Sequence, residues 1–148
     1  MKPHVDRHLK FATGFTLLEV VAVLFIIGII SAVVVSKAVS NASEEARAEQ
    51  RQVKAHLRYA QSRAMADNAD WGIYFASANT YRLFQTDAAN RRVLPGQDAD
   101  TVTLAHLGIT SAPQTITFDG HGSPGDADVT IGTSGDTITV TANTGYIP

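Results

Sequence analysis

The sequence predicts an α+β fold in which a long N-terminal helix packs on an antiparallel β-sheet domain. Residues 15–35 are almost wholly apolar, residues 37–70 keep a helical period, and residues 71–148 alternate with a period of two. We therefore divide the 148-residue chain into a basic N-terminal segment (1–14), a transmembrane helix (15–36), its amphipathic continuation (37–70) and an antiparallel β domain (71–148).

The first element is the apolar run from Phe15 to Val35, after which Lys37 is the next charge. A 21-residue helix is about 31 Å long, close to the thickness of the hydrocarbon core of a bilayer. The N-terminal segment carries Lys2, Arg7 and Lys10 against one acid, Asp6. Because basic flanks stay in the cytoplasm, we expect a single-pass membrane protein whose C-terminal domain lies on the far side of the membrane.

Glu19 lies inside this apolar run. An unpaired carboxylate there costs roughly 2.5 kcal/mol or more, so such a residue normally has a partner. The candidate partner is a free α-amino group at Phe15, supplied by a neighbouring subunit after the chain has been cut.

The segment Gly14-Phe15-Thr16-Leu17-Leu18-Glu19 resembles the type IV prepilin processing motif. In that family a membrane aspartyl peptidase, the prepilin peptidase, cuts after the Gly and methylates the new N-terminus. The resemblance implies that Gly14 and Phe15 flank the cut, that Phe15 is methylated, and that Glu19 forms the charge pair that guides assembly. Residues 1–14 are then a prepilin leader, and residues 15–36 form the filament core once the chain has been incorporated.

Three other interpretations compete for the same residues. A Sec signal peptide could be cut near Ser40-Asn41-Ala42, but its apolar region has 7–15 residues and no carboxylate. An uncut membrane anchor leaves Glu19 unexplained, and a buried core helix does not need more than 20 apolar residues.

Ser36 stands where major pilins usually have Pro, which favours a minor subunit.

The helical period continues beyond Lys37. An apolar stripe recurs at spacings of three, four and seven, and its members are Val39, Ala42, Ala46, Val53, Leu57, Ala60 and Ala64. Neither Pro nor Gly interrupts the run from Ile29 to Asp70, so we expect one helix of more than 50 residues. The charges between the stripe positions predict a solvated face.

After Asp70 the period changes to two, which predicts about six short strands. They are residues 71–75, 80–84, 101–104, 115–118, 129–131 and 137–141. Turn residues separate them, and the last two strands should form a hairpin. The helix stripe should cover the resulting antiparallel sheet.

This half of the chain resembles the GspH/FimT group. The similarity rests on residues 57–64 with Asn68, on the first strand at 71–75, and on residues 116–122 with the closing hairpin before Tyr146. That group contains minor pseudopilins of type II secretion and minor pilins of type IV pili, which are thought to sit at the filament tip. The resemblance implies a structural subunit whose partners are other pilins or pseudopilins.

Catalytic and cofactor sites are not indicated. The chain has no cysteine, its five histidines lack metal-ligand spacing, and no Ser lies in a nucleophile elbow. We therefore expect a protein that is not an enzyme and has no cofactor. The segment 119–128 offers Asp119, Asp126 and Asp128 as candidate calcium ligands, but it lacks the EF-hand spacing and favours a plain turn.

The charge distribution argues against nucleic acid as a partner. Residues 71–148 carry three arginines and seven aspartates, a net charge of −4, whereas binding a polyanion needs clustered Lys and Arg. The local group of basic residues that would favour nucleic-acid binding consists of Arg82, Arg91 and Arg92.

The leading hypothesis for the function is a minor pseudopilin or minor pilin. A major pilin, a filament-displayed DNA-uptake receptor and a membrane-tethered enzyme follow in that order.

Overall fold

The computed structural model describes residues 15–148, apart from the side chains of residues 32–41. Several predictions fall outside these described residues. They are the leader with Gly14, the end of the predicted span at 32–36, Ser36, Val39 of the stripe, and the alternative cut near Ser40-Asn41. The chain divides into two compact units, Met1–Val39 and Ser40–Pro148, and each is described by itself.

The helix α1 runs from Leu17 to Asp67, 51 residues, which confirms the prediction of a helix longer than 50 residues. Thr16 caps its N-terminus, because the Thr16 hydroxyl accepts the N–H of Glu19 at 3.2 Å. At the other end Asn68 has a φ of 46°, a left-handed conformation that ends helices and that Asn tolerates better than most residues.

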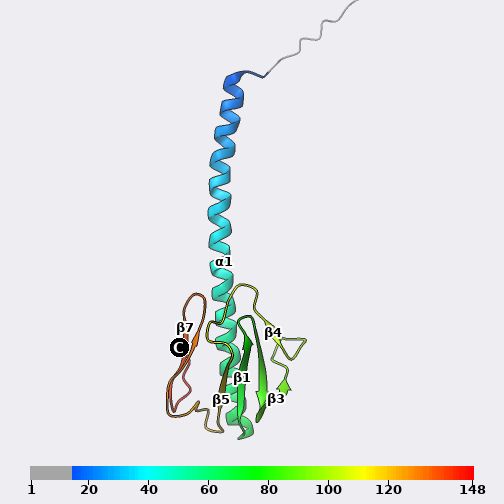
Figure 1. Ribbon diagram of the computed structural model, residues 1–148, viewed down its shortest axis with the longest axis vertical. Coiled ribbons are helices and arrows are strands. Elements are labelled where there is room, and N and C mark those ends of the chain that lie inside the picture. Colours follow the sequence, from blue (N-terminus) through cyan, green and yellow to red (C-terminus); the bar gives the residue numbers. More distant parts are fainter. Residues whose placement is uncertain (1–14) are drawn as a thin grey trace, which may run out of the picture. The chain divides into compact units, whose positions relative to one another are not determined.

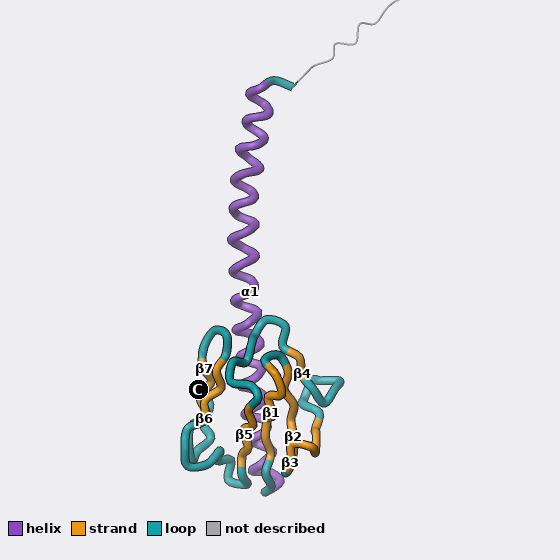
Figure 2. The backbone as a smooth tube through the Cα atoms, in the orientation of Figure 1, coloured by secondary structure: helices purple, strands orange, loops and turns teal. Residues whose placement is uncertain are grey.

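Seven strands follow the helix in the second unit (Figure 2). They are β1 (Trp71–Ser77), β2 (Thr80–Gln85), β3 (Asp87–Arg92), β4 (Val102–Thr103), β5 (Gln114–Phe118), β6 (Val129–Gly132) and β7 (Thr137–Val140). The first five form an antiparallel sheet in the order β3-β2-β1-β5, with β4 also paired to β2. β6 and β7 form a separate hairpin, as the sequence predicts.

Two features of the sheet differ from the prediction. β3 has the sequence Asp-Ala-Ala-Asn-Arg-Arg, which contains no β-branched or aromatic residue, and five of its six residues are exposed. It pairs as an edge strand through its backbone, so side-chain patterning carried no signal for it. The strands also form two sheets instead of one.

The core lies between the C-terminal part of α1 and the two sheets, and Figure 1 shows this part of α1 running behind β1 and β5. Four stripe residues, Val53, Leu57, Ala60 and Ala64, are completely buried, whereas Ala42 is exposed and Ala46 is half-buried. The stripe prediction therefore holds from residue 53 onward. It is wrong for Ala42, because the sheets do not extend that far along the helix.

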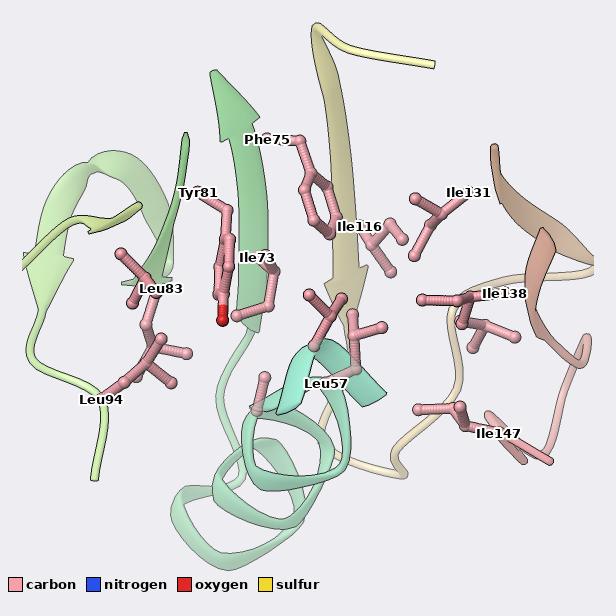
Figure 3. Close-up of a cluster of buried hydrophobic side chains, with 14 of the residues drawn as sticks. Leu57, Ile73, Phe75, Tyr81, Leu83, Leu94, Ile116, Ile131, Ile138 and Ile147 are labelled. Atoms are coloured by element: carbon pink, nitrogen blue, oxygen red, sulfur yellow. The ribbon is translucent and has the colours of Figure 1, made fainter. Parts of the chain in front are cut away.

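The helix and the two sheets close one common core. Figure 3 shows Leu57 of α1 among Ile73 of β1, Ile116 of β5, and Ile131 and Ile138 of the hairpin. The hairpin thus joins the core through its side chains, although it shares no strand ladder with the larger sheet.

Candidate functional site

The first candidate site is the start of α1. Phe15, Leu17 and Leu18 are 83%, 84% and 78% exposed, so no described residue covers these large apolar side chains. Thr16 holds the helix start, which places Glu19 in the first turn, next to the positive end of the helix dipole.

Glu19 lies in an apolar setting. It lines a groove of about 270 Å³ together with Phe15, Val20, Val23 and Leu24. Among the described residues no ion pair or side-chain hydrogen bond satisfies its carboxylate. A carboxylate flanked by apolar side chains and without a partner is a strong acceptor for a cationic group from another molecule.

The apolar surface continues along the helix as far as Ile30. Every large apolar residue from Val20 to Ile30 is 49–70% exposed. Contiguous apolar surface of this kind marks contact with lipid or with another protein. Within the part of the chain whose side chains the structure describes, no helix is both long and apolar enough to cross a membrane.

The second candidate site joins α1 to the loop after β4. Both carboxylate oxygens of Glu49 accept backbone N–H groups from three consecutive residues, Ala105, His106 and Leu107, at 2.9, 2.9 and 2.7 Å. Desolvation opposes the charge on Glu49, but these three bonds and the nearby His106 outweigh it and lower the pKa of Glu49. One turn earlier, Glu45 lies 3.1 Å from the His106 ring.

This loop anchor is a contact that sequence reasoning missed. Glu49 belongs to a run of mixed charges that predicted a solvated face. One signal in the sequence could have found it. Glu49 lies four residues, about one helical turn, before Val53 of the buried stripe, and so it faces the same side of the helix.

His56 and Tyr81 form a buried polar pair between the helix and β2. His56 Nδ1 lies 2.7 Å from the Tyr81 hydroxyl, and Tyr81 is completely buried. Burial lowers the pKa of His56, and burial together with the negative charge of Glu49 raises the pKa of Tyr81. Both groups are therefore neutral in the folded protein near pH 7, and the geometry gives His56 a packing role.

The distal segment 119–128 uses two of its candidate calcium ligands to shape turns. Asp119 accepts the N–H groups of His121 and Ser123 at 2.9 Å each, and Asp128 accepts that of Ala142 at 2.7 Å. The bond from Ser123 is the main cause of the lowered pKa of Asp119. Asp126 is exposed. Among the described residues, no group of three or more His, Cys, Asp or Glu side chains could hold a metal ion.

Arg82 and Arg91 both lie near Asp100, whereas Arg92 lies on the other face of the sheet. Arg82 lies 4.5 Å above the Tyr74 ring, Arg91 pairs with Asp100 at 3.3 Å, and Arg92 donates to Gln85. Adjacent residues of a strand point to opposite faces, so Arg91 and Arg92 do not belong to one patch. Each of the three arginines already has a partner within its own chain.

Comparison with known proteins identifies the fold and the family. Two crystal forms of the type IV minor pilin FimU from Pseudomonas aeruginosa (strain PAO1) have similar structures, with TM-scores of 0.52 and 0.53 at 17% and 19% identity. The alignments cover 69% and 72% of this chain and 90% and 88% of FimU. No curated protein matches the chain in sequence.

The sequence itself supplies the family. Residues 49–145 match the family described as type II transport protein GspH. These residues include the Glu49 anchor, the His56–Tyr81 pair and all seven strands. The fold and the matched residues agree, and the chain belongs to the GspH family.

Proposed function

We propose that this protein is a minor pseudopilin or minor pilin, a structural subunit of a filament in type II protein secretion or type IV pilus assembly. The observation that carries the proposal is the exposed apolar start of α1 in a chain of the GspH family. Its family and fold are those of structural subunits, and the proposed role requires no catalysis.

The exposed apolar side chains need a cover that the described residues do not supply. Fully burying one Leu, Ile, Val or Phe side chain is worth about 1.5–3 kcal/mol, and the twelve large apolar residues from Phe15 to Ile30 are roughly half exposed or more. Before assembly the cover is the inner membrane, and after assembly it is formed by the helices of other pilins or pseudopilins. The domain after the helix lies in the periplasm.

Processing frees the group that Glu19 requires. A prepilin peptidase cuts between Gly14 and Phe15 and methylates the Phe15 amine, which then pairs with Glu19 of a neighbouring subunit. The Phe15 side chain and Glu19 line one apolar groove, where a pair of opposite charges is screened less than in water. Because apolar contacts allow many registers, this pair would fix the axial step between subunits.

The test separates assembly from processing. Glu19→Ala and Glu19→Gln should leave cleavage and folding unchanged, since Glu19 is exposed and its carboxylate bonds to no described residue. Both variants should be lost from sheared filaments, because Gln keeps the shape of Glu19 but not its charge. Leu18→Ala, which removes an exposed apolar side chain one residue away, is the matched control and should still be incorporated.

Intact-mass analysis of the membrane fraction measures processing, and immunoblots of sheared filaments measure incorporation. The expected mature chain has 134 residues and begins with methylated Phe15. If both Glu19 variants assemble normally, the charge pair has no role. A chain cut near Ala42 instead of after Gly14 would contradict the filament proposal as a whole.

A further inference from the structure

The charges of α1 between residues 44 and 58 are sorted by the fold. Glu45 and Glu49 turn toward the loop after β4, where His106 and three backbone N–H groups hold them. Glu49 is thus held within the unit, whereas Glu45 stays about half exposed beside His106. The outward face of this part of α1 is mainly basic, with Glu44 at its border.

Four basic residues form a line on that outward face: Arg47, Arg51, Lys54 and Arg58. Their spacings of four, three and four place them along one side of a helix over about 17 Å. Arg47, Arg51 and Arg58 are exposed and Lys54 is half-buried, whereas the buried stripe lies on the other side of the helix. We call these four residues the basic line.

The basic line is poorly neutralised by its own chain. Arg51 and Lys54 make no ion pair with any described residue, and Arg58 donates one bond to the Ile147 carbonyl at 2.8 Å. Arg47 pairs with Glu44 at 3.2 Å, but both side chains are at least 60% exposed. An exposed pair of this kind is worth about 0–1 kcal/mol, so Arg47 can change partners at little cost.

A groove adjoins the Arg47 end of the line. It has a volume of about 420 Å³ and lies between α1 and the β6–β7 turn, with Arg47, Gln50, Leu107 and Gly135 among its lining residues. Gln50 brings an amide nitrogen that is buried and has no hydrogen-bond partner. The groove thus combines an apolar wall with polar groups, among them Asp136 of the β6–β7 turn, beside a row of cations.

We propose that the basic line and this groove dock the acidic surface of a neighbouring filament subunit. The inference rests on the proposed filament function and names the surface through which the second unit meets its neighbour. A filament grows by heterologous contacts, in which one patch of a subunit meets a different, complementary patch on the next. Residues 71–148 of this chain carry three arginines and seven aspartates, and a neighbour with the same distribution of charge would offer an acidic surface to the basic line.

A neighbouring subunit explains these features better than a polyanion does. Tight binding of DNA needs many phosphate contacts, whereas the line offers four cations and is bordered by Glu44. The acidic sheet region of the same unit would repel an extended anion. A protruding carboxylate on a folded surface, by contrast, matches a short row of cations that ends in a groove.

The experiment uses the full chain in the cells that assemble the filament. A photo-crosslinking amino acid replaces Ala55, which is exposed beside the basic line. The double variant Arg51→Glu/Lys54→Glu should lower the yield of the crosslink at least about tenfold, because like charges then face each other. The matched control Arg91→Glu/Arg92→Glu makes the same change in net charge on β3 and should leave the yield within about twofold.

A second variant tests the groove without changing any charge. A Cβ added at Gly135 meets no atom within 4 Å, so Gly135→Trp fills the groove and leaves the fold intact. It should lower the crosslink yield as the charge reversal does. Ala89→Trp, at an exposed position on β3, is the control for a bulky surface residue.

Mass spectrometry of the crosslinked product decides the outcome. A crosslink to an acidic peptide of another pilin-like subunit supports the proposal. A crosslink to lipid or DNA, or equal effects of the reversal and its control, would overturn it, and so would full crosslinking by Gly135→Trp. Because wild-type incorporation into sheared filaments is scored in parallel, failure of the docking surface is distinguishable from failure of the filament function.

Discussion

Replacing Glu49 by Ala tests how the helix holds the loop after β4. The substitution removes one acceptor from three backbone donors at once, those of Ala105, His106 and Leu107. Ala105 and His106 are exposed, so water can replace the carboxylate there, whereas Leu107 is only 3% exposed and forms the shortest of the three bonds. Hydrogen bonds to a charged group contribute about 1.5–3 kcal/mol each, and exposure reduces two of them.

We therefore expect Glu49→Ala to lower the free energy of unfolding by about 3 kcal/mol, net of a few tenths gained from the higher helix propensity of Ala. Glu49→Gln keeps one acceptor oxygen and should cost about half as much. Glu44→Ala is the matched control, because Glu44 makes only an exposed pair with Arg47. It should change stability by less than about 0.5 kcal/mol.

Urea denaturation of the full-length chain in mild detergent measures these differences. Trp71 is the single tryptophan and is 5% exposed in the core, so its fluorescence reports unfolding of the second unit. Equal stability of the Glu49→Ala and Glu44→Ala variants would refute the loop-anchor argument.

The same measurement at lower pH gives an independent check. The pKa of Glu49 is lowered from its ordinary 4.5 by the three bonds. A carboxylate with a lowered folded pKa contributes stability above its unfolded pKa and loses that contribution as the pH falls through the folded pKa. The difference between the wild type and Glu49→Ala should therefore shrink on acidification below about pH 4.5. A constant difference would mean that the charge is not what holds the loop.

Three further predictions follow from other parts of the molecule. Burial lowers the pKa of His56 below 6.5, so the unfolded chain takes up a proton first and stability should fall as the pH falls below 6.5; His56→Gln should flatten this slope in urea titrations at pH 7.5 and 5.5. Gly145→Ala should cost about 2–3 kcal/mol, since φ is +63° and the added methyl meets the Gly122 carbonyl and the Gln61 amide, whereas Gly135→Ala meets nothing and should cost less than about 0.5 kcal/mol in the same assay. Quantitative mass spectrometry of sheared filaments should find this chain far below the main subunit, and its presence as the dominant component would favour a major pilin.

The helix and several strands could be predicted from the sequence, because the patterns that indicate them lie within short stretches of the chain. A single α1 helix follows from apolar and amphipathic periods that no Pro or Gly interrupts beyond Ile29, and strands β1, β2 and β5 follow from the alternation of large β-formers. The prepilin motif is equally local, and the assignments of Gly14, Phe15 and Glu19 remain predictions that depend on it. Periodicity and motifs report what neighbouring residues do together, which is why they suffice here.

Other features depend on contacts between residues that are far apart in the sequence, and these could be read only from the folded structure. β3 forms by backbone pairing to β2, and the separation of β6–β7 from the larger sheet depends on packing against Leu57 and Ile116. The sequence shows Glu45 and Glu49 as members of a mixed charge run. The loop after β4, more than 50 residues away, decides the direction of these acids: its N–H groups hold the Glu49 carboxylate, and its His106 ring lies beside the half-exposed Glu45.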